Sequence, residues 1–451
     1  MLATTTAAPS WKQLLRYVIP AASAMVLFSL YTVIDGILVA HGVSESALTS
    51  VNISLPFINV LSGLSILLSM GASTLCAFAL GRGKKREAEE IFTQTVVVMV
   101  ILSAAITAGV LLFTEELALF LGAGPQTLEN AVTYLRIVSV FSVCFILSYC
   151  LEVMVKVDDS PVLATVGVAV AAVVHVGLAY VFIFHFHWGV AGSALATGLA
   201  QLCSLIVFLI YFVGGKSDLR FRKFRFQPKT LLRSLPLGVA DCSIEFMLGF
   251  LTVLYNNLLF LLFGESHQTI YAVIAYLSLL VFMVMQGIAQ GMMPLVSVAV
   301  GKGDRKAIRF YFLRSLVLVV GAEVLIVAAC LLLPQRFAAI LLSTDSPLFT
   351  QAVAALRQYA LSYLLAGINI LLAGFFTALG HGKASCLLSL SRGFVLLPAA
   401  ILVLSHLTGG QAIWIAALAG EGLSFVLGLV LLKRITASPA PLPAQEAEPA
   451  V

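Results

Sequence analysis

Twelve long apolar stretches alternate with short polar connections along most of the chain. Each stretch reaches the roughly 20 residues that a helix needs to cross the hydrocarbon core of a bilayer. The pattern therefore predicts an all-α polytopic membrane protein with twelve transmembrane helices. The expected spans are residues 13–40, 47–80, 88–113, 127–155, 160–185, 188–213, 230–263, 266–300, 305–333, 347–379, 383–405 and 409–435.

The connection 214–229, GGKSDLRFRKFRFQPK, is the only long polar interval in the sequence. It divides the chain into an expected N-lobe of residues 1–213, holding six spans, and a C-lobe of residues 230–436, holding the other six. We interpret the connection itself as a cytoplasmic linker. Residues 437–451 are rich in Pro and Ala and are expected to form a disordered cytoplasmic tail.

The two halves resemble each other at an offset of 220 residues. Gly71 corresponds to Gly291, and Gly189 corresponds to Gly409. Because six crossings is an even number, the halves should have the same orientation and be related by a pseudo-two-fold axis along the membrane normal. The sequence thus predicts two pseudo-symmetric six-helix bundles with a cleft between them, an arrangement suited to alternating access.

Positive charge is confined almost entirely to alternate connections. All but three of the 26 Lys and Arg residues lie on the side that also holds both termini. Cytoplasmic loops carry an excess of Lys and Arg, so we expect a multi-pass protein of the cell inner membrane with cytoplasmic N- and C-termini. The exceptions are Arg136, Arg336 and Arg357.

The composition excludes a soluble protein. Of the 451 residues, 61% are hydrophobic and 10% are charged, and the mean hydropathy is +1.06. A soluble domain carries about 25% charged residues. The net charge of +5 comes from the inner loops, and the basic and aromatic stretch 220–226 is better explained by anionic membrane lipid than by nucleic acid. We therefore expect membrane lipid, and no nucleic acid, among the partners.

Catalytic and cofactor motifs are absent from the sequence. The seven cysteines lie inside apolar stretches without CxxC spacing, so we interpret them as small buried hydrophobes and expect no metal site. Gly215-Lys216-Ser217 resembles the end of a phosphate-binding loop, but Ile210 stands where that loop needs Gly. We predict no cofactor and no enzyme activity; the energy for any pumping must come from an ion gradient or from another subunit.

Ionisable residues inside the apolar stretches are the first candidates for function, because a charge at membrane depth costs about 2.5–3.5 kcal/mol on insertion scales. Asp35 lies in the outer half of the first stretch, and His175 lies in the fifth. A buried carboxyl group and an imidazole can both exchange protons near neutral pH, so we assign proton coupling to this pair of residues. The alternative is that each is paired to a neighbour and serves helix packing.

Further polar residues are candidates for a substrate cavity, although each could instead hydrogen-bond between helices. These candidates are Tyr31, Tyr149, Thr197, Gln201, Glu245, Asn256, Asn257, Tyr276, Gln286 and Asn369.

Other polar and glycine residues favour structural roles. We expect one ion pair between Glu152 and Lys156 and a second between Glu421 and Arg392. Asp241 is interpreted as structural, and Glu323 has no expected partner. Gly287-x-x-x-Gly291 predicts a close contact between helices.

Several segments, in order and spacing, resemble the MATE (multidrug and toxic compound extrusion) transporters, with the bacterial DinF-like branch nearest. The resemblance covers residues 11 to 436. It rests on YTVIDGILVA at 31–40, GRGKKREAEE at 81–90, DDSP at 158–161, WGVAGSALAT at 188–197, QGIAQGMMP at 286–294, FTALG at 376–380 and the Ser-Arg pair at 391–392.

This resemblance implies a V-shaped pair of six-helix lobes that open alternately and expel amphipathic cations in exchange for H⁺ or Na⁺. Asp35 matches the family's carboxylate in the first helix, Thr197 a polar cavity residue and Glu245 an acid of the seventh helix. The fifth helix departs from the family, with His175 and Ala179 where many members have Asn and Asp. Since Na⁺ prefers several oxygen ligands, this departure favours H⁺ as the coupling ion.

Three functions remain open at this point. The first is a proton-coupled antiporter for organic cations, with Na⁺ coupling as a variant, working as a monomer. The second is a flippase for a lipid-linked precursor or an exporter of another organic solute; a flippase of this kind would need a cationic cleft. The third is a membrane scaffold without turnover.

Overall fold

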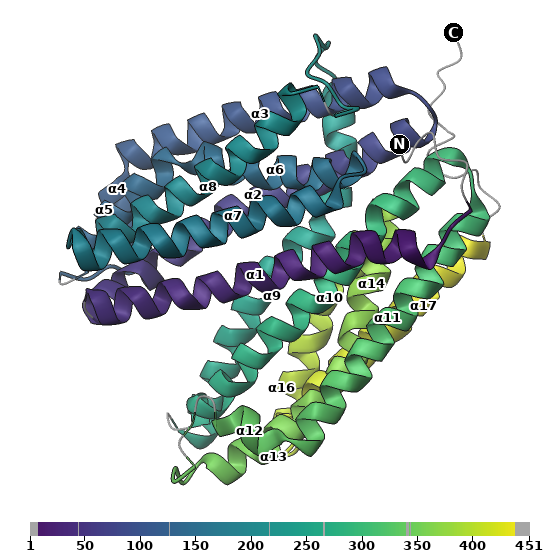
Figure 1. Ribbon diagram of the computed structural model, residues 1–451. Coiled ribbons are helices and arrows are strands. Elements are labelled where there is room, and N and C mark those ends of the chain that lie inside the picture. The colour runs from purple at the N-terminus through teal and green to yellow at the C-terminus, as the bar shows by residue number, and fades with distance from the viewer. Residues whose placement is uncertain are drawn as a thin grey trace. The chain divides into compact units, whose positions relative to one another are not determined.

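The computed structural model describes residues 8–43, 45–125, 127–215, 217–264, 267–339, 342 and 344–437. These residues are mostly helical and contain no strand. Figure 1 shows the elements α1 (Trp11–Gly42), α2 (Glu45–Gly81), α3 (Lys85–Leu112), α4 (Thr114–Phe120), α5 (Leu128–Val140), α6 (Ser142–Val157), α7 (Pro161–Tyr180), η1 (Val181–His185), α8 (Gly189–Val213), α9 (Pro228–Phe263), α10 (Gln268–Lys302), α11 (Arg305–Leu332), α12 (Pro334–Ala339), α13 (Phe349–Ala360), α14 (Tyr363–Ala378), α15 (Gly382–Ser391), η3 (Arg392–Leu396), α16 (Leu397–Leu407) and α17 (Ala416–Ala437).

The predicted spans coincide with long helical segments of the structure. Nine described segments are long and apolar enough to cross a membrane, and counting each of the bent pairs α5–α6 and α13–α14 as one span raises the number to eleven. α1, with 32 residues, is the remaining segment of the predicted set. The segment ends agree within a few residues, except that the last begins at residue 416 rather than 409. The all-α, multi-pass fold class is therefore confirmed.

Two bends were not predicted. The axes of α5 and α6 differ by 50°, and those of α13 and α14 by 42°. Pro and Gly, the usual causes of a helix kink, are absent from both breaks. At the first break the backbone N–H of Phe141 donates to Val138 and Ser139, a local tightening of the helix, and its ring packs against Gly198 of α8. The bend therefore depends on packing rather than on a helix-breaking residue.

The internal repeat is visible in the backbone. α3 and α11 begin and end 220 residues apart. The residues that follow them, Phe113 and Leu333, have nearly the same dihedral angles, φ −125° and ψ 34° against φ −124° and ψ 35°. Gly189 and Gly409 both adopt positive φ, +55° and +58°, a conformation that favours glycine. The 220-residue repeat predicted from the sequence is thus present in the local structure.

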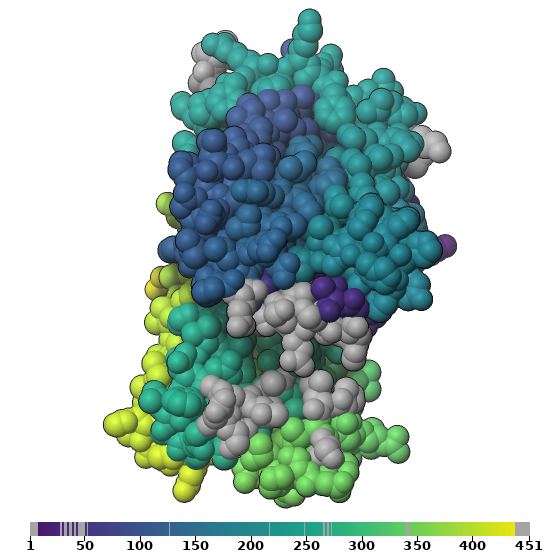
Figure 2. All heavy atoms as spheres, turned by 90° about the vertical axis from the view of Figure 1, so that its left-hand side faces the viewer, coloured from purple at the N-terminus to yellow at the C-terminus, as the bar shows by residue number. Residues whose placement is uncertain are grey.

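The chain forms two compact units whose boundaries pass through two helices. The first unit holds residues 23–238, and the second holds residues 8–22 together with the chain from residue 239 onward. α1 and α9 each contribute to both units. The predicted linker lies within the first unit, whose side chains form the closely packed blue to teal face in Figure 2. The predicted tail lies outside the described residues from residue 438 onward.

Glycines allow the shared helices to pack closely. In the first unit, Gly71 of α2 lies against the backbone carbonyl of Ser234 on α9. In the second unit, a Cβ atom at Gly291 of α10 would lie 2.6 Å from the Cα of Val18 on α1, and Gly287 is equally close to Ala22. The close helix contact predicted for the GxxxG sequence is confirmed. Neither helix pair would tolerate a larger side chain at these positions.

Candidate functional site

The two residues assigned to proton coupling lie together in the first unit. α1 supplies Asp35 and α7 supplies His175, and the Nε2 atom of the imidazole is 3.3 Å from the Oδ1 atom of the carboxylate. The His175 side chain is 2% exposed and the Asp35 side chain 16% exposed. The pair is thus largely secluded, which limits exchange of its protons with bulk water.

α8 adds two hydroxyl groups to this pair. Ser193 donates from Oγ to Asp35 Oδ1 at 3.2 Å, and Thr197 Oγ1 lies 3.1 Å from His175 Nε2. The spacing of four residues places Ser193 and Thr197 on one face of α8. Because Thr197 donates its own proton to the Ser193 carbonyl, it faces the imidazole as an acceptor. A proton on Nε2 would therefore face two acceptors, Asp35 and Thr197.

This arrangement can hold a variable number of protons. With neutral imidazole and ionised carboxylate the pair carries one negative charge, and one further proton makes it neutral. Within the described part of the chain, no group of three or more His, Cys, Asp or Glu side chains is placed to hold a metal ion. The site thus consists of a carboxylate and an imidazole with two hydroxyl neighbours.

The other candidates in the first unit lie on α1, α6 and α8. Gln201 of α8 accepts a hydrogen bond from Ser148 of α6 at 2.7 Å, so its side chain joins two helices. Tyr149 lies next to Ser148 on α6 and is half-buried. The side chain of Tyr31 lies outside the described residues. The structure therefore brings Thr197 to the Asp35 pair and uses Gln201 in a contact between helices.

The candidates in the second unit are dispersed. Gln286 of α10 donates to Asp241 of α9 at 2.6 Å, which agrees with a structural interpretation of Asp241. Asn257 is exposed and donates to Val253 of its own helix at 2.8 Å. Tyr276 is 54% exposed. The remaining two half-buried candidates are Glu245 and Asn256.

Asn369 belongs to a buried charged network rather than to an open surface. Its amide Nδ2 donates to Glu421 Oε2 at 2.7 Å. Arg392, in the π-helical segment η3, donates from Nε and Nη2 to the same carboxylate at 2.8–3.1 Å. The predicted Arg392–Glu421 pair is confirmed. By the 220-residue offset, Gln201 stands at the position of Glu421 and Ala172 at that of Arg392, so this ion pair has no counterpart in the first repeat.

Two further buried acids also have partners. The predicted pair of Glu152 and Lys156 is confirmed, with Nζ 2.7 Å from Oε1 and both side chains buried. Glu323, for which the sequence suggested no partner, accepts a hydrogen bond from the backbone N–H of Ile368 at 3.2 Å. Its carboxyl group therefore serves the backbone of α14, close to the bend after α13.

Sequence reasoning missed Ser193 as a site residue. Its position four residues before Thr197 on a predicted helix was the available signal, because that spacing puts both hydroxyls on one face. Ser148 was also missed, since a lone serine in an apolar stretch predicts no particular partner. Both side chains are buried.

The chain matches a known protein family and several of its members. The MatE family model matches residues 20–181 and 242–402, which is more than half of the chain. The multidrug export protein MepA of Staphylococcus aureus is 22% identical over 428 residues, covering 94% of both chains. MepA of Staphylococcus saprophyticus is 25% identical over 384 residues, covering 83% of this chain and 84% of the relative.

Solved structures show the same fold. A MATE transporter in complex with MaL6 superposes with a TM-score of 0.89 at 21% identity, covering 94% of this chain and 96% of that one. An outward-facing multidrug resistance MATE family transporter of the MOP superfamily gives a TM-score of 0.88 at 20% identity, with the same coverage. Helix order, internal repeat and family match all agree, and the chain accordingly belongs to the MatE family, as a multi-pass membrane transporter and not an enzyme.

Proposed function

We propose that this chain is a secondary active antiporter that exports amphipathic, cationic small molecules in exchange for protons. Its similarity to proteins named as multidrug exporters supports the substrate class. The contact between Asp35 and His175 carries the proposal of proton coupling, because it joins two titratable groups in a secluded part of a transporter. The protein would work as a monomer in the cell inner membrane, with both termini in the cytoplasm.

The proposed exchange follows from the charge of the pair. Without the extra proton the pair is negative and favours a cation near α1, α7 and α8. Protonation neutralises the pair, which weakens the attraction for the cation and changes how the carboxylate is shared between Ser193 and His175. A ligand shifts a conformational equilibrium only by its different affinity for the two states. The proton and the substrate would therefore bias alternating access in opposite directions.

Two alternatives fit the site less well. A Na⁺ site would need several oxygen ligands, whereas one of the groups that contact the Asp35 carboxylate is an imidazole nitrogen, 3.3 Å from Oδ1. A flippase for a pyrophosphate-linked lipid would need unpaired buried cations. The buried cations Lys156 and Arg392 each lie against a carboxylate, which supports export of cations over transport of anions.

The test is antiport in proteoliposomes. The purified protein is reconstituted with a pH-sensitive dye inside, and a lipophilic cation such as tetraphenylphosphonium is added against a proton gradient. We expect cation-driven proton movement in the wild type and at least a tenfold loss in Asp35→Asn and in His175→Gln. Glu115→Gln, which makes the same chemical change at an exposed position, should retain full activity.

The alternatives predict other outcomes. Transport driven by a Na⁺ gradient at constant pH would contradict proton coupling. Full antiport by Asp35→Asn would contradict the role of the pair while leaving the substrate class intact. A wild-type protein that folds and moves neither ion nor cation would support the scaffold alternative.

A further inference from the structure

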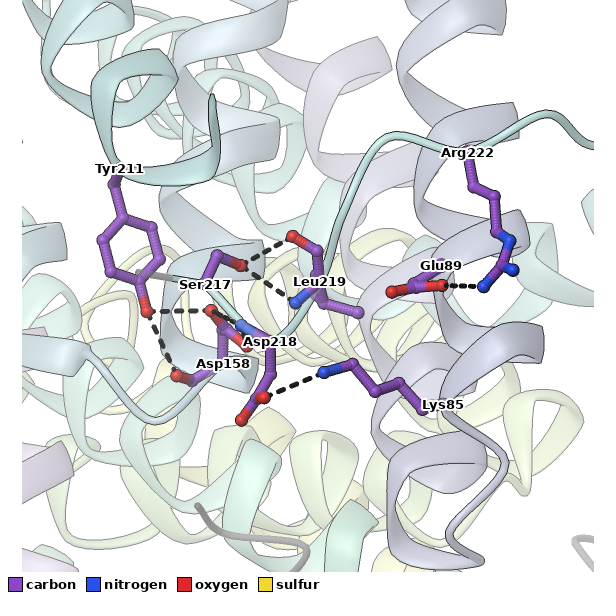
Figure 3. A network of polar contacts seen from close by, with 8 residues as sticks. All are labelled: Lys85, Glu89, Asp158, Tyr211, Ser217, Asp218, Leu219 and Arg222. Atoms are coloured by element: carbon purple, nitrogen blue, oxygen red, sulfur yellow. Dashed lines mark hydrogen bonds and ion pairs between the residues drawn. The ribbon is translucent and has the colours of Figure 1, made fainter. Parts of the chain in front are cut away.

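The connection before α9 is a fixed part of the first unit rather than a free linker. We call residues 217–227 the strap. Figure 3 shows its first residues bound to α3, α8 and the turn after α6. The Ser217 hydroxyl bonds within the strap to the backbone of Leu219, and the Leu219 side chain is fully buried. These hydrogen bonds and the buried Leu219 side chain fix the beginning of the strap, so the other side chains extend from a backbone that is held in place.

Carboxylates hold the beginning of the strap. The backbone N–H of Asp218 donates to Asp158 at 3.1 Å, and Tyr211 donates to the same carboxylate at 2.8 Å (Figure 3). Burial raises the pKa of the Asp158 carboxyl group, and these hydrogen bonds act in the opposite direction and lower it. Lys85 donates to the Asp218 carboxylate at 3.0 Å and lowers the pKa of that group.

The rest of the strap is fixed along α3. Arg222 donates to the buried carboxylate of Glu89 at 2.9 Å. Gln94 exchanges two hydrogen bonds with the backbone of Gln227, at 2.9 and 3.0 Å. The ring of Phe221 lies 4.9 Å from that of Phe92. Together these contacts hold the strap to α3 at residues 221, 222 and 227.

The opposite edge of the strap carries unpaired positive charge. Arg220, Lys223 and Arg225 are exposed, and none of them forms an ion pair with a described residue. Arg220 and Lys223 flank Phe221 and Arg222, which contact α3, and Arg225 lies two residues before Gln227, which also contacts α3. Lys229, in the first turn of α9, extends the same charge.

Exposed apolar groups lie beside these cations. Phe226 is 56% exposed, and Leu232, one turn into α9, is 64% exposed. α9 begins at Pro228 and is long and apolar enough to span the membrane, so both groups lie at the start of a candidate membrane span. Cations immediately before a membrane span, next to apolar side chains, match the charge and depth of an anionic lipid interface.

We propose that the outer edge of the strap is a preformed binding site for the headgroups of anionic phospholipids, such as phosphatidylglycerol, in the leaflet that α9 enters. Arg220, Lys223 and Arg225 bind the phosphates, and Phe226 and Leu232 contact the acyl region. The contacts with α3 keep the three cations in place before the lipid arrives, which lowers the cost of ordering them on binding.

The experiment counts lipids on the full-length protein. The protein is reconstituted in nanodiscs of equal amounts of phosphatidylglycerol and phosphatidylcholine, transferred to detergent, and examined by native mass spectrometry. The wild type should retain phosphatidylglycerol in preference to phosphatidylcholine. Each surface cation changes such binding about fivefold, so the R220Q/K223Q/R225Q variant should lose a preference on the order of a hundredfold.

Two matched variants separate the strap from net charge. R305Q/K306Q/R309Q removes three exposed cations at the start of α11, the counterpart of α3 in the second repeat, and should keep the lipid preference. Gln94→Leu removes the two bonds to Gln227 without changing any charge, and should weaken the preference severalfold.

Three outcomes would overturn the proposal. An equal loss of preference in the two triple variants would show that only net charge matters. An unchanged preference in Gln94→Leu would show that the site is not preformed. Tight binding of a short single-stranded oligonucleotide by the wild type, with no preference between the two lipids, would assign the surface to nucleic acid instead. Gel filtration of each variant confirms that the fold is retained.

Discussion

Removing the Glu421 carboxylate should destabilise the second unit more than most single substitutions. The Arg392 side chain is 4% exposed and that of Glu421 is 2% exposed, and three hydrogen bonds join them. Glu421→Leu would leave a buried guanidinium without its counter-charge, and Asn369 would keep only the backbone carbonyl of residue 421 as an acceptor there. Breaking a buried ion pair from one side costs about 3–5 kcal/mol, because the remaining charge stays out of water.

The double variant Arg392→Met/Glu421→Leu removes both charges and fills similar volume. Replacing a buried ion pair by apolar residues is often neutral, so we expect the double variant to lose much less stability than either single variant. The exposed pair of Lys85 and Asp218 provides the contrast, since its side chains are 49% and 53% exposed. Asp218→Asn should cost less than about 1 kcal/mol.

The assay is reversible unfolding of the purified protein in detergent, followed by circular dichroism over a denaturant series. Arg392→Met, Glu421→Leu and the double variant form a double-mutant cycle with the wild type. A coupling energy of at least about 2 kcal/mol is expected, within the range seen for residues in one network. A cost below about 1 kcal/mol for Glu421→Leu, or a double variant equal to the sum of the singles, would refute the reasoning.

Three further predictions concern other parts of the molecule. Gly71→Leu should prevent folding, because its side chain would meet the α9 backbone, whereas Gly109→Ala, with no atom within 4 Å of its Cβ position, should be tolerated; equal yields of folded protein on gel filtration would contradict this. Ser193→Ala should keep the fold and slow antiport about fivefold in proteoliposomes, since one hydrogen bond to Asp35, worth about 1 kcal/mol, is lost; an unchanged rate would contradict its role. The hydrogen bond from Lys85 lowers the pKa of the Asp218 carboxyl group. The stability that this contact contributes is therefore present above the ordinary carboxyl pKa and is lost as pH falls through the lowered value. Asp218→Asn should flatten the acid side of the melting-temperature profile, and an unaltered profile would contradict the assignment.

The sequence predicts the helices of this protein well, because membrane insertion depends on local hydrophobicity. The spans and the repeat follow from the apolar pattern and the glycine positions alone. The bends near Phe141 and Leu361 do not, since neither break contains the Pro or Gly that would signal a kink in the sequence. The π-helical turn at Arg392 is equally invisible in the sequence, although the residue's partner was predicted.

The candidate site was predictable in part. Asp35 and His175 stand out because ionisable residues are costly in an apolar stretch, whichever role they have. Ser193 does not, because a small hydroxyl in a helix carries no such cost. The strap was interpreted as part of a cytoplasmic linker because its sequence is polar and basic, and its contacts with α3 were not predicted. Its contacts with Glu89 and Gln94 join residues more than 130 positions apart, which no local pattern reveals.

The division of α1 between the two units has a consequence for biosynthesis. Residues 8–22 belong with a unit whose remaining part of the chain begins at residue 239, within α9, and their glycine contacts lie on α10, which starts at residue 268. Position 268 follows position 22 by 246 residues, which a ribosome adds in about 10–50 seconds. The first turns of the nascent chain must therefore wait in the bilayer without their final neighbour, and a ribosome that stalls in the first half releases a product in which α1 cannot complete its packing.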